Sequence, residues 1–127
     1  RTADEIEPAM TRLAKAGVQG LVILPGNIFT PERNRVLRLA APQRWPVIAG
    51  SPEFAESGAL LAYGADREGM YRRAAYYVDR ILKGARPGDL PIEQPTKFEL
   101  VVNMKTAKGL GLALPQPFLM RADRVIE

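Results

Sequence analysis

The residues of this chain that could do chemistry lie in three short segments, each at the end of an apolar run. Amide and hydroxyl side chains both donate and accept hydrogen bonds, and aromatic rings cover the apolar body of a small molecule. Together these residue types suit ligand binding. The candidate ligand-binding residues are Asn27, Phe29, Ser51, Phe54 and Tyr63.

A purely structural role is the alternative for each of these positions. Asn27, Ser51 and the nearby Asp66 have the side chains that cap helices, because their oxygens accept hydrogen bonds from the first helical amides. Phe29 and Phe54 are large apolar residues of the kind that fill a core. The sequence alone leaves both interpretations open.

Composition excludes several kinds of catalysis. The 127 residues include no cysteine and no histidine, so a thiol nucleophile, an imidazole base, a disulfide and a Cys/His zinc site are all impossible. Glu53 and Glu56 stand three apart on one short expected helix. A general acid and base need two different environments, and both of these carboxylates are expected to face solvent. We expect no catalytic residue, no cofactor and no metal.

The positive charge of the chain is spread out. Lys and Arg total 18 against 14 Asp and Glu, a formal net charge of +4. Arg33, Arg35 and Arg38 are interleaved with Glu32, and no basic run alternates with the aromatics on which bases stack. We therefore expect a solvated surface and no nucleic-acid partner. No apolar run approaches the roughly 18 residues of a membrane-spanning helix.

Short apolar runs alternate with helical patterns along the chain, which predicts an α/β fold with a mostly parallel sheet and flanking helices. The first run lacks polar alternation and is expected to be buried on both faces of the sheet. Ligands of such sheets bind beyond the carboxyl ends of the strands, where the candidate residues fall. The expected strands are Leu21–Leu24, Pro46–Gly50, Ala59–Gly64 and Phe98–Asn103, and the longest helix follows Asp66 and ends at Lys83 and Gly84.

A long stretch of the C-terminal half resembles a known family. The stretch consists of Asp66–Gly84 (DREGMYRRAAYYVDRILKG), Ala85–Asn103 and Lys105–Leu112. It resembles the substrate-binding component of ABC-type importers, in the uncharacterised tryptophan/tyrosine-importer-like group. The match is most specific from Tyr71 to Leu112, and Asp4–Ala9 and Leu21–Pro25 fit the family's earlier helix and strand.

The resemblance implies a type I periplasmic-binding-protein fold, in which two α/β lobes hold a ligand between them. This chain then corresponds to the C-terminal portion, less than half of such a protein. It implies a second-lobe segment over residues 1–50, a segment resembling the first lobe over 51–91, and a return to the second lobe over 92–127. Within these, Ala85–Pro95 resembles a hinge crossing.

The resemblance also bears on the candidate residues. Asn27 stands where members often have Asp, and Tyr63 matches the tyrosine of the family's "SYG", with Ala62 in place of the serine. The segment Ser51–Phe54 stands where members often read "GFREF", and its first two residues, Ser51 and Pro52, depart from that pattern.

The function implied is non-enzymatic binding of a small organic solute, possibly an amino-acid-like one, for an ABC-type import system. Its partner is the membrane permease, and its location is periplasmic or lipid-anchored outside the cytoplasm, by resemblance and not from any signal peptide in these residues. An effector-sensing domain of a transcriptional regulator has the same fold and is the alternative. An upstream helix-turn-helix would favour the regulator and an upstream signal peptide would favour transport. As part of a longer protein, the chain is expected to expose apolar surface and to form a homodimer or a domain-swapped assembly.

Overall fold

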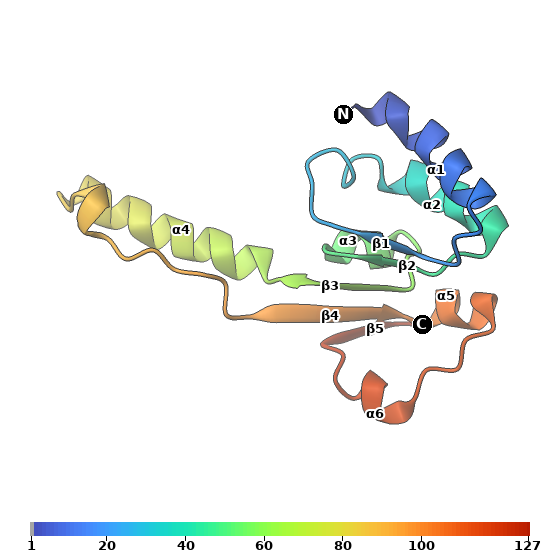
Figure 1. Ribbon diagram of the computed structural model, residues 1–127. Helices are drawn as coiled ribbons and strands as arrows, with labels where there is room; N and C mark the ends of the chain where they lie inside the picture. Colours follow the sequence, from blue (N-terminus) through green and yellow to red (C-terminus); the bar gives the residue numbers. More distant parts are fainter. Residues whose placement is uncertain (1) are drawn as a thin grey trace. The chain divides into compact units, whose positions relative to one another are not determined.

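The computed structural model describes residues 2–127, and helices and strands alternate along them (Figure 1). The chain divides into two compact units. One contains the residues up to Gly64 together with Glu99–Glu127, and the other is Ala65–Phe98. The assignment of residues 1–50, 51–91 and 92–127 to the lobes of a longer protein stays a prediction.

The five strands form one sheet in the order β1-β2-β3-β4-β5. Strands β1, β2 and β3 are parallel, and β5 is parallel to β4. The chain reverses between β3 and β4, where the Asn103 amide donates to the Leu60 carbonyl and the arrows in Figure 1 point in opposite directions. The α/β class and the mostly parallel sheet are therefore confirmed. The strands are β1 (Leu21–Ile23), β2 (Val47–Ala49), β3 (Leu61–Ala65), β4 (Phe98–Asn103) and β5 (Arg124–Ile126).

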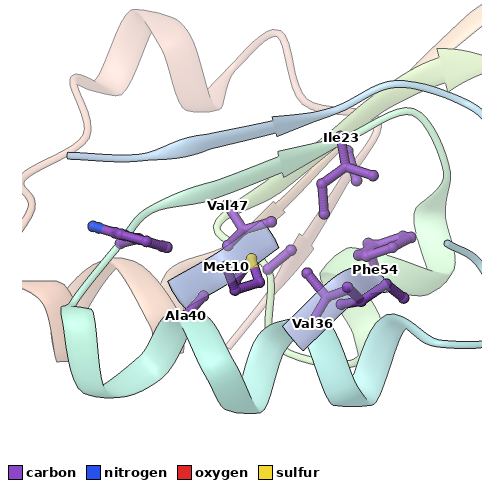
Figure 2. Packing of buried hydrophobic residues seen from close by; sticks show 10 residues of the cluster. Met10, Ile23, Val36, Ala40, Val47 and Phe54 are labelled. Atoms are coloured by element: carbon purple, nitrogen blue, oxygen red, sulfur yellow. The ribbon is translucent and has the colours of Figure 1, made fainter. Parts of the chain in front are cut away.

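One hydrophobic core lies between the first strands and the helices α1 and α2. Figure 2 shows Met10 of α1 and Val36 and Ala40 of α2 meeting Ile23 and Val47 of the sheet, with Phe54 of α3 beside them. Burial of the larger of these side chains supplies about 1.5–3 kcal/mol each. The helices of this unit are α1 (Ile6–Lys15), α2 (Arg33–Ala40), α3 (Pro52–Glu56), α5 (Met104–Leu110) and α6 (Gln116–Leu119), with short 3-10 turns at Ala3–Glu5 and Ala41–Gln43.

The buried Asn103 connects helix α5 to a second, smaller hydrophobic cluster, which contains Ala55, Ala62 and Val101. The side chain is only 5% exposed, and its Nδ2 donates to the Ala55 carbonyl at 2.8 Å. Its Oδ1 accepts from the Thr106 N–H at 2.9 Å and so caps α5. Ala55 packs there with Ala62 and Val101. The end of β4 is thus fixed both to α3 and to the helix that follows it.

Strand β1 differs from the expectation. Only Ile23 is buried, whereas Val22 is 71% exposed and Leu24 is 73% exposed. The strand lies at the edge of the sheet, and among residues 2–127 nothing buries these two side chains. The expectation of burial on both faces was therefore wrong. Strand β5 was not expected at all, because it is three residues long and starts with an arginine.

The second unit is built on the long helix α4 (Arg67–Leu82). The Asp66 Oδ1 accepts from the Gly69 N–H at 2.9 Å, so the predicted cap is confirmed. After α4 the chain makes the 3-10 turn Pro87–Asp89 and runs back alongside the helix as an extended segment (Figure 1). Tyr77 of α4 donates its hydroxyl to the Pro91 carbonyl at 2.9 Å, which fastens this segment to the helix.

Candidate functional site

The loops after β1 and β2 lie close to the end of β3 at the carboxyl edge of the sheet, because Gly50 and Gly64 carry no side chains. A Cβ at Gly64 would lie 2.0 Å from the Gly50 carbonyl oxygen, and a Cβ at Gly50 would lie 2.7 Å from Cγ of Pro25. A side chain at Gly50 would push the loop after β2 away from Pro25, and one at Gly64 would push β3 away from the loop after β2. The candidate residues of the two loops and of β3 consequently share one edge, which we call the carboxyl edge.

A turn over Gly26–Phe29 presents two of the candidates. The Phe29 N–H donates to the Gly26 carbonyl at 3.2 Å, and the ring lies over Gly26, where a Cβ would be 3.5 Å from Cδ2 of the ring. Phe29 is still 38% exposed and Asn27 is exposed. Asn27 caps no helix, since α2 begins only at Arg33 and has Glu32 at its N-cap. The structure therefore leaves both side chains available to a ligand.

Ser51 is the most informative of the candidates. It is 9% exposed, and its Oγ is buried without a hydrogen-bond partner among residues 2–127. It occupies the N-cap position of α3, but its side chain makes no capping hydrogen bond. An unpaired buried hydroxyl costs about 1–3 kcal/mol. A ligand with a polar group at the carboxyl edge would supply the missing partner.

Tyr63 and Phe54 differ sharply in exposure. Tyr63 is 57% exposed, on the opposite side of β3 from the buried Ala62. Phe54 is 2% exposed and belongs to the hydrophobic core. The structure thus brings Asn27, Phe29, Ser51 and Tyr63 to the carboxyl edge, while Phe54 takes the core role that was its alternative.

The second unit has a groove of about 510 Å³ between α4 and the segment Glu93–Lys97. The charged side chains that line this groove form ion pairs with one another. The Arg73 guanidinium donates two hydrogen bonds to the Glu93 carboxylate, one of them at 2.7 Å, and Lys97 lies 3.2 Å from Asp66. The groove is therefore held by internal ion pairs and contains none of the five candidate residues.

These interactions lower the pKa values of the two carboxylates in the groove. Hydrogen bonds from Arg73 hold the pKa of Glu93 at about 2. The hydrogen bond from the Gly69 N–H, and then Lys97, lower the pKa of Asp66. The sequence analysis missed this cluster. Its only sequence signal is the spacing of Arg73 and Tyr77 on one helix face, and nothing in the connector shows that Glu93 returns to them.

Glu93→Gln is expected to loosen the extended segment from α4 at neutral pH but not in strong acid. The folded state lowers the pKa of this carboxyl, so its stabilising effect is present above the unfolded value of about 4 and disappears as the pH falls towards 2. The measurement is the protection of the Asp66 amide, which donates to the Lys97 carbonyl at 3.0 Å, against hydrogen exchange. Protection should be lower in the variant at pH 6, and the difference should vanish only below pH 2. The exposed, charge-matched Glu127→Gln should change nothing, and a difference for Glu93→Gln that is independent of pH would contradict the assignment.

The described residues hold no other obvious site. Within residues 2–127 no three or more carboxylates gather in a group able to hold a metal ion. No helix of that part of the chain is long and apolar enough to cross a membrane.

A family model described as ABC transporter substrate binding protein matches residues 1–126 of the chain. Among curated proteins, the tyrosine-binding protein of Clostridioides difficile (strain R20291) is 26% identical over 111 residues, which are 87% of this chain and 32% of that protein. The chain thus spans about a third of this curated relative.

Two solved structures share the fold. A conserved domain protein from Vibrio cholerae matches 98% of this chain with a TM-score of 0.90 and 25% identity, over 42% of its own length. An ABC domain from Streptococcus pneumoniae in complex with L-Trp matches 98% of this chain with a TM-score of 0.92 and 23% identity, also over 42% of its own length.

Proposed function

Since the chain belongs to the family of ABC transporter substrate binding proteins, we propose that it is part of a solute-binding protein and provides one side of the ligand site. The solute is a small amino-acid-like molecule with an aromatic side chain. The relative named for tyrosine binding and the structural neighbour bound to L-Trp support this class of ligand.

The observation that carries the proposal is the buried, unpartnered Ser51 hydroxyl at the carboxyl edge. A polar group of the ligand completes its hydrogen bonding, and Asn27 provides a second donor and acceptor. Phe29 and Tyr63, both partly exposed, cover the apolar part of the ligand. Phe54 holds α3 in place from the core and does not touch the ligand.

The rest of the longer protein completes the site. Two lobes close on the ligand, and the closed form is presented to the membrane permease of an ABC importer outside the cytoplasm. The role is binding without catalysis, since the chain has neither histidine nor cysteine and its paired Glu53 and Glu56 share a single short helix. The family match favours this role over effector sensing by a transcriptional regulator.

Ser51→Ala tests the proposal by two effects of opposite sign. Without ligand, removal of an unpaired buried hydroxyl is expected to raise the free energy of unfolding by up to about 1 kcal/mol. With ligand, the lost hydrogen bond leaves a polar group of the ligand unpaired and should weaken binding about 10-fold. Urea unfolding gives the first value, and calorimetry of the longer protein with L-tyrosine and L-tryptophan gives the second.

Ser57→Ala is the matched control. The Ser57 Oγ already accepts a hydrogen bond from Arg33 Nε at 3.0 Å, so its loss should destabilise the unit by about 1 kcal/mol and leave the ligand affinity unchanged. Unchanged affinity in Ser51→Ala, in a protein that does bind one of these amino acids, would contradict the assignment of Ser51. Absence of heat with every amino acid tested would contradict the proposed ligand class.

A further inference from the structure

Basic side chains of the sheet-containing unit gather at the end of the sheet opposite the carboxyl edge. Helices α1 and α2 lead into the parallel strands β1 and β2, so their last turns lie at the end where these strands begin. Strand β4 runs the other way and α5 follows it directly, so α5 lies at the same end (Figure 1). Six exposed basic side chains belong to these elements, and we call them the basic edge: Arg12, Lys15, Arg38, Arg44, Lys105 and Lys108.

The charge of the basic edge is not neutralised within residues 2–127, where none of the six side chains forms an ion pair. At the other end of the unit, by contrast, Arg35 pairs with Glu7 at 3.2 Å. Strand direction places one carboxylate, Glu127 after β5, on the side of the basic edge. The other acidic residues of the unit lie toward the carboxyl edge: Asp4, Glu5, Glu7, Glu32, Glu53, Glu56, Glu99 and Asp123.

Helix dipoles explain only part of this set. Basic residues are favourable in the last turn of a helix, and α1, α2 and α5 each have them there. Lys105, however, stands in the first turn of α5, where the dipole disfavours a cation and no acidic residue accompanies it. Arg44 follows the turn Ala41–Gln43 with a positive φ of 54°, and its Nη2 donates to the Leu110 carbonyl at 3.2 Å. The six charges repel one another, and an anionic partner would relieve that repulsion.

We propose that the basic edge binds the anionic headgroups of a phospholipid membrane. Lysine and arginine side chains near an anionic lipid surface each add to the attraction, without any shaped pocket. Leu112, which follows α5 and is 40% exposed, is placed to enter the headgroup layer. No aromatic ring belongs to the set, which disfavours a single-stranded nucleic acid as the partner. The choice of a membrane also rests on the proposed role beside a permease, whereas the positive charge does not.

The attachment should be weak and reversible. The attraction falls off within a Debye length, about 8 Å at 0.15 M salt, so only side chains close to the headgroups contribute. The binding protein would then stay near the membrane that contains its permease and still exchange with the solution.

Co-sedimentation with lipid vesicles tests the proposal, on the 127-residue chain and on the longer protein. Vesicles of phosphatidylcholine with phosphatidylglycerol are anionic, and vesicles of phosphatidylcholine alone are the neutral comparison. We expect binding to the anionic vesicles only, and its loss at about 1 M salt, where the Debye length is about 3 Å. Failure of the longer protein to bind the anionic vesicles, or equal binding to both kinds, would overturn the proposal.

A pair of matched variants tests the assignment to the basic edge. Lys105→Gln with Lys108→Gln should weaken binding to the anionic vesicles at least about 10-fold, because two charges leave this surface. Arg86→Gln with Arg121→Gln removes two exposed charges elsewhere and should bind as the parent does. Circular dichroism verifies that both double variants keep the helix content of the parent. Equal weakening by the two would mean a general effect of net charge and would contradict the assignment.

Two further probes separate the other anionic partners. Binding to polyglutamate or to double-stranded DNA, with no binding to the anionic vesicles, would overturn the proposal in favour of an acidic protein or a nucleic acid. Calorimetry with L-tyrosine and L-tryptophan on the same longer protein keeps this inference apart from the proposed function. Vesicle binding without amino-acid binding contradicts only the proposed ligand class, and amino-acid binding without vesicle binding contradicts only the membrane contact.

Discussion

Gly64→Ala is expected to destabilise the sheet-containing unit by about 3 kcal/mol or more. The new Cβ would lie 2.0 Å from the carbonyl oxygen and 2.9 Å from the carbonyl carbon of Gly50. Both are backbone atoms, so no side-chain rotation relieves the clash, and β3 and the loop after β2 must move apart. Urea unfolding followed by fluorescence of Trp45, the single tryptophan and a 6% exposed core residue, measures the loss.

The same substitution should also weaken ligand binding by the longer protein, because Ser51 and Tyr63 flank the two glycines. Gly109→Ala in α5 is the matched control. A Cβ there would meet nothing within 4 Å, and alanine favours a helix interior over glycine by about 0.5–1 kcal/mol. The control should therefore be neutral or slightly more stable. If Gly64→Ala were no less stable than this control, the close approach of β3 to the loop after β2 would not exist.

Phe54→Ala is expected to cost about 3–5 kcal/mol of the free energy of unfolding. The ring is 2% exposed and packs in the core with Ile23 and Val36, so its removal leaves a cavity that the sheet and α2 cannot readily fill. The same unfolding experiment measures this loss.

Phe29→Ala is the natural comparison, because both phenylalanines closely follow a strand, Phe29 in the turn after β1 and Phe54 in helix α3 after β2. Phe29 is 38% exposed, and its loss should change stability by less than about 1 kcal/mol. In the longer protein it should instead weaken binding of an aromatic amino acid. Equal destabilisation by the two substitutions would contradict the division into a core ring and a ligand-facing ring.

Local patterns of the sequence were sufficient for most of the first unit and for the long helix. Continuous apolar runs indicated four of the five strands, and Asp66 marked the start of α4 as it does in the structure. Strand β5 could not be found in this way. It is three residues long, and it is a strand only by its pairing with β4, beside which the Asp123 amide donates to the Leu100 carbonyl.

The position of the candidate residues at the carboxyl edge was predictable, but the exposure of each side chain was not. Phe29 and Phe54 follow strands at similar distances, and only the direction of α3, which turns Phe54 into the core, separates them. Ser51 is a residue type that commonly caps helices and it stands at the N-cap of α3, yet its hydroxyl makes no capping hydrogen bond. The pairing of Arg73 with Glu93 depends on a chain reversal 20 residues long, which no local pattern encodes.

A structure of the longer protein bound to L-tryptophan or L-tyrosine tests the central claim most directly. It should show the Ser51 Oγ within hydrogen-bond distance of a polar group of the ligand, with Phe29 or Tyr63 against its ring. A ligand bound away from the carboxyl edge, with the Ser51 hydroxyl still unpartnered, would contradict the account.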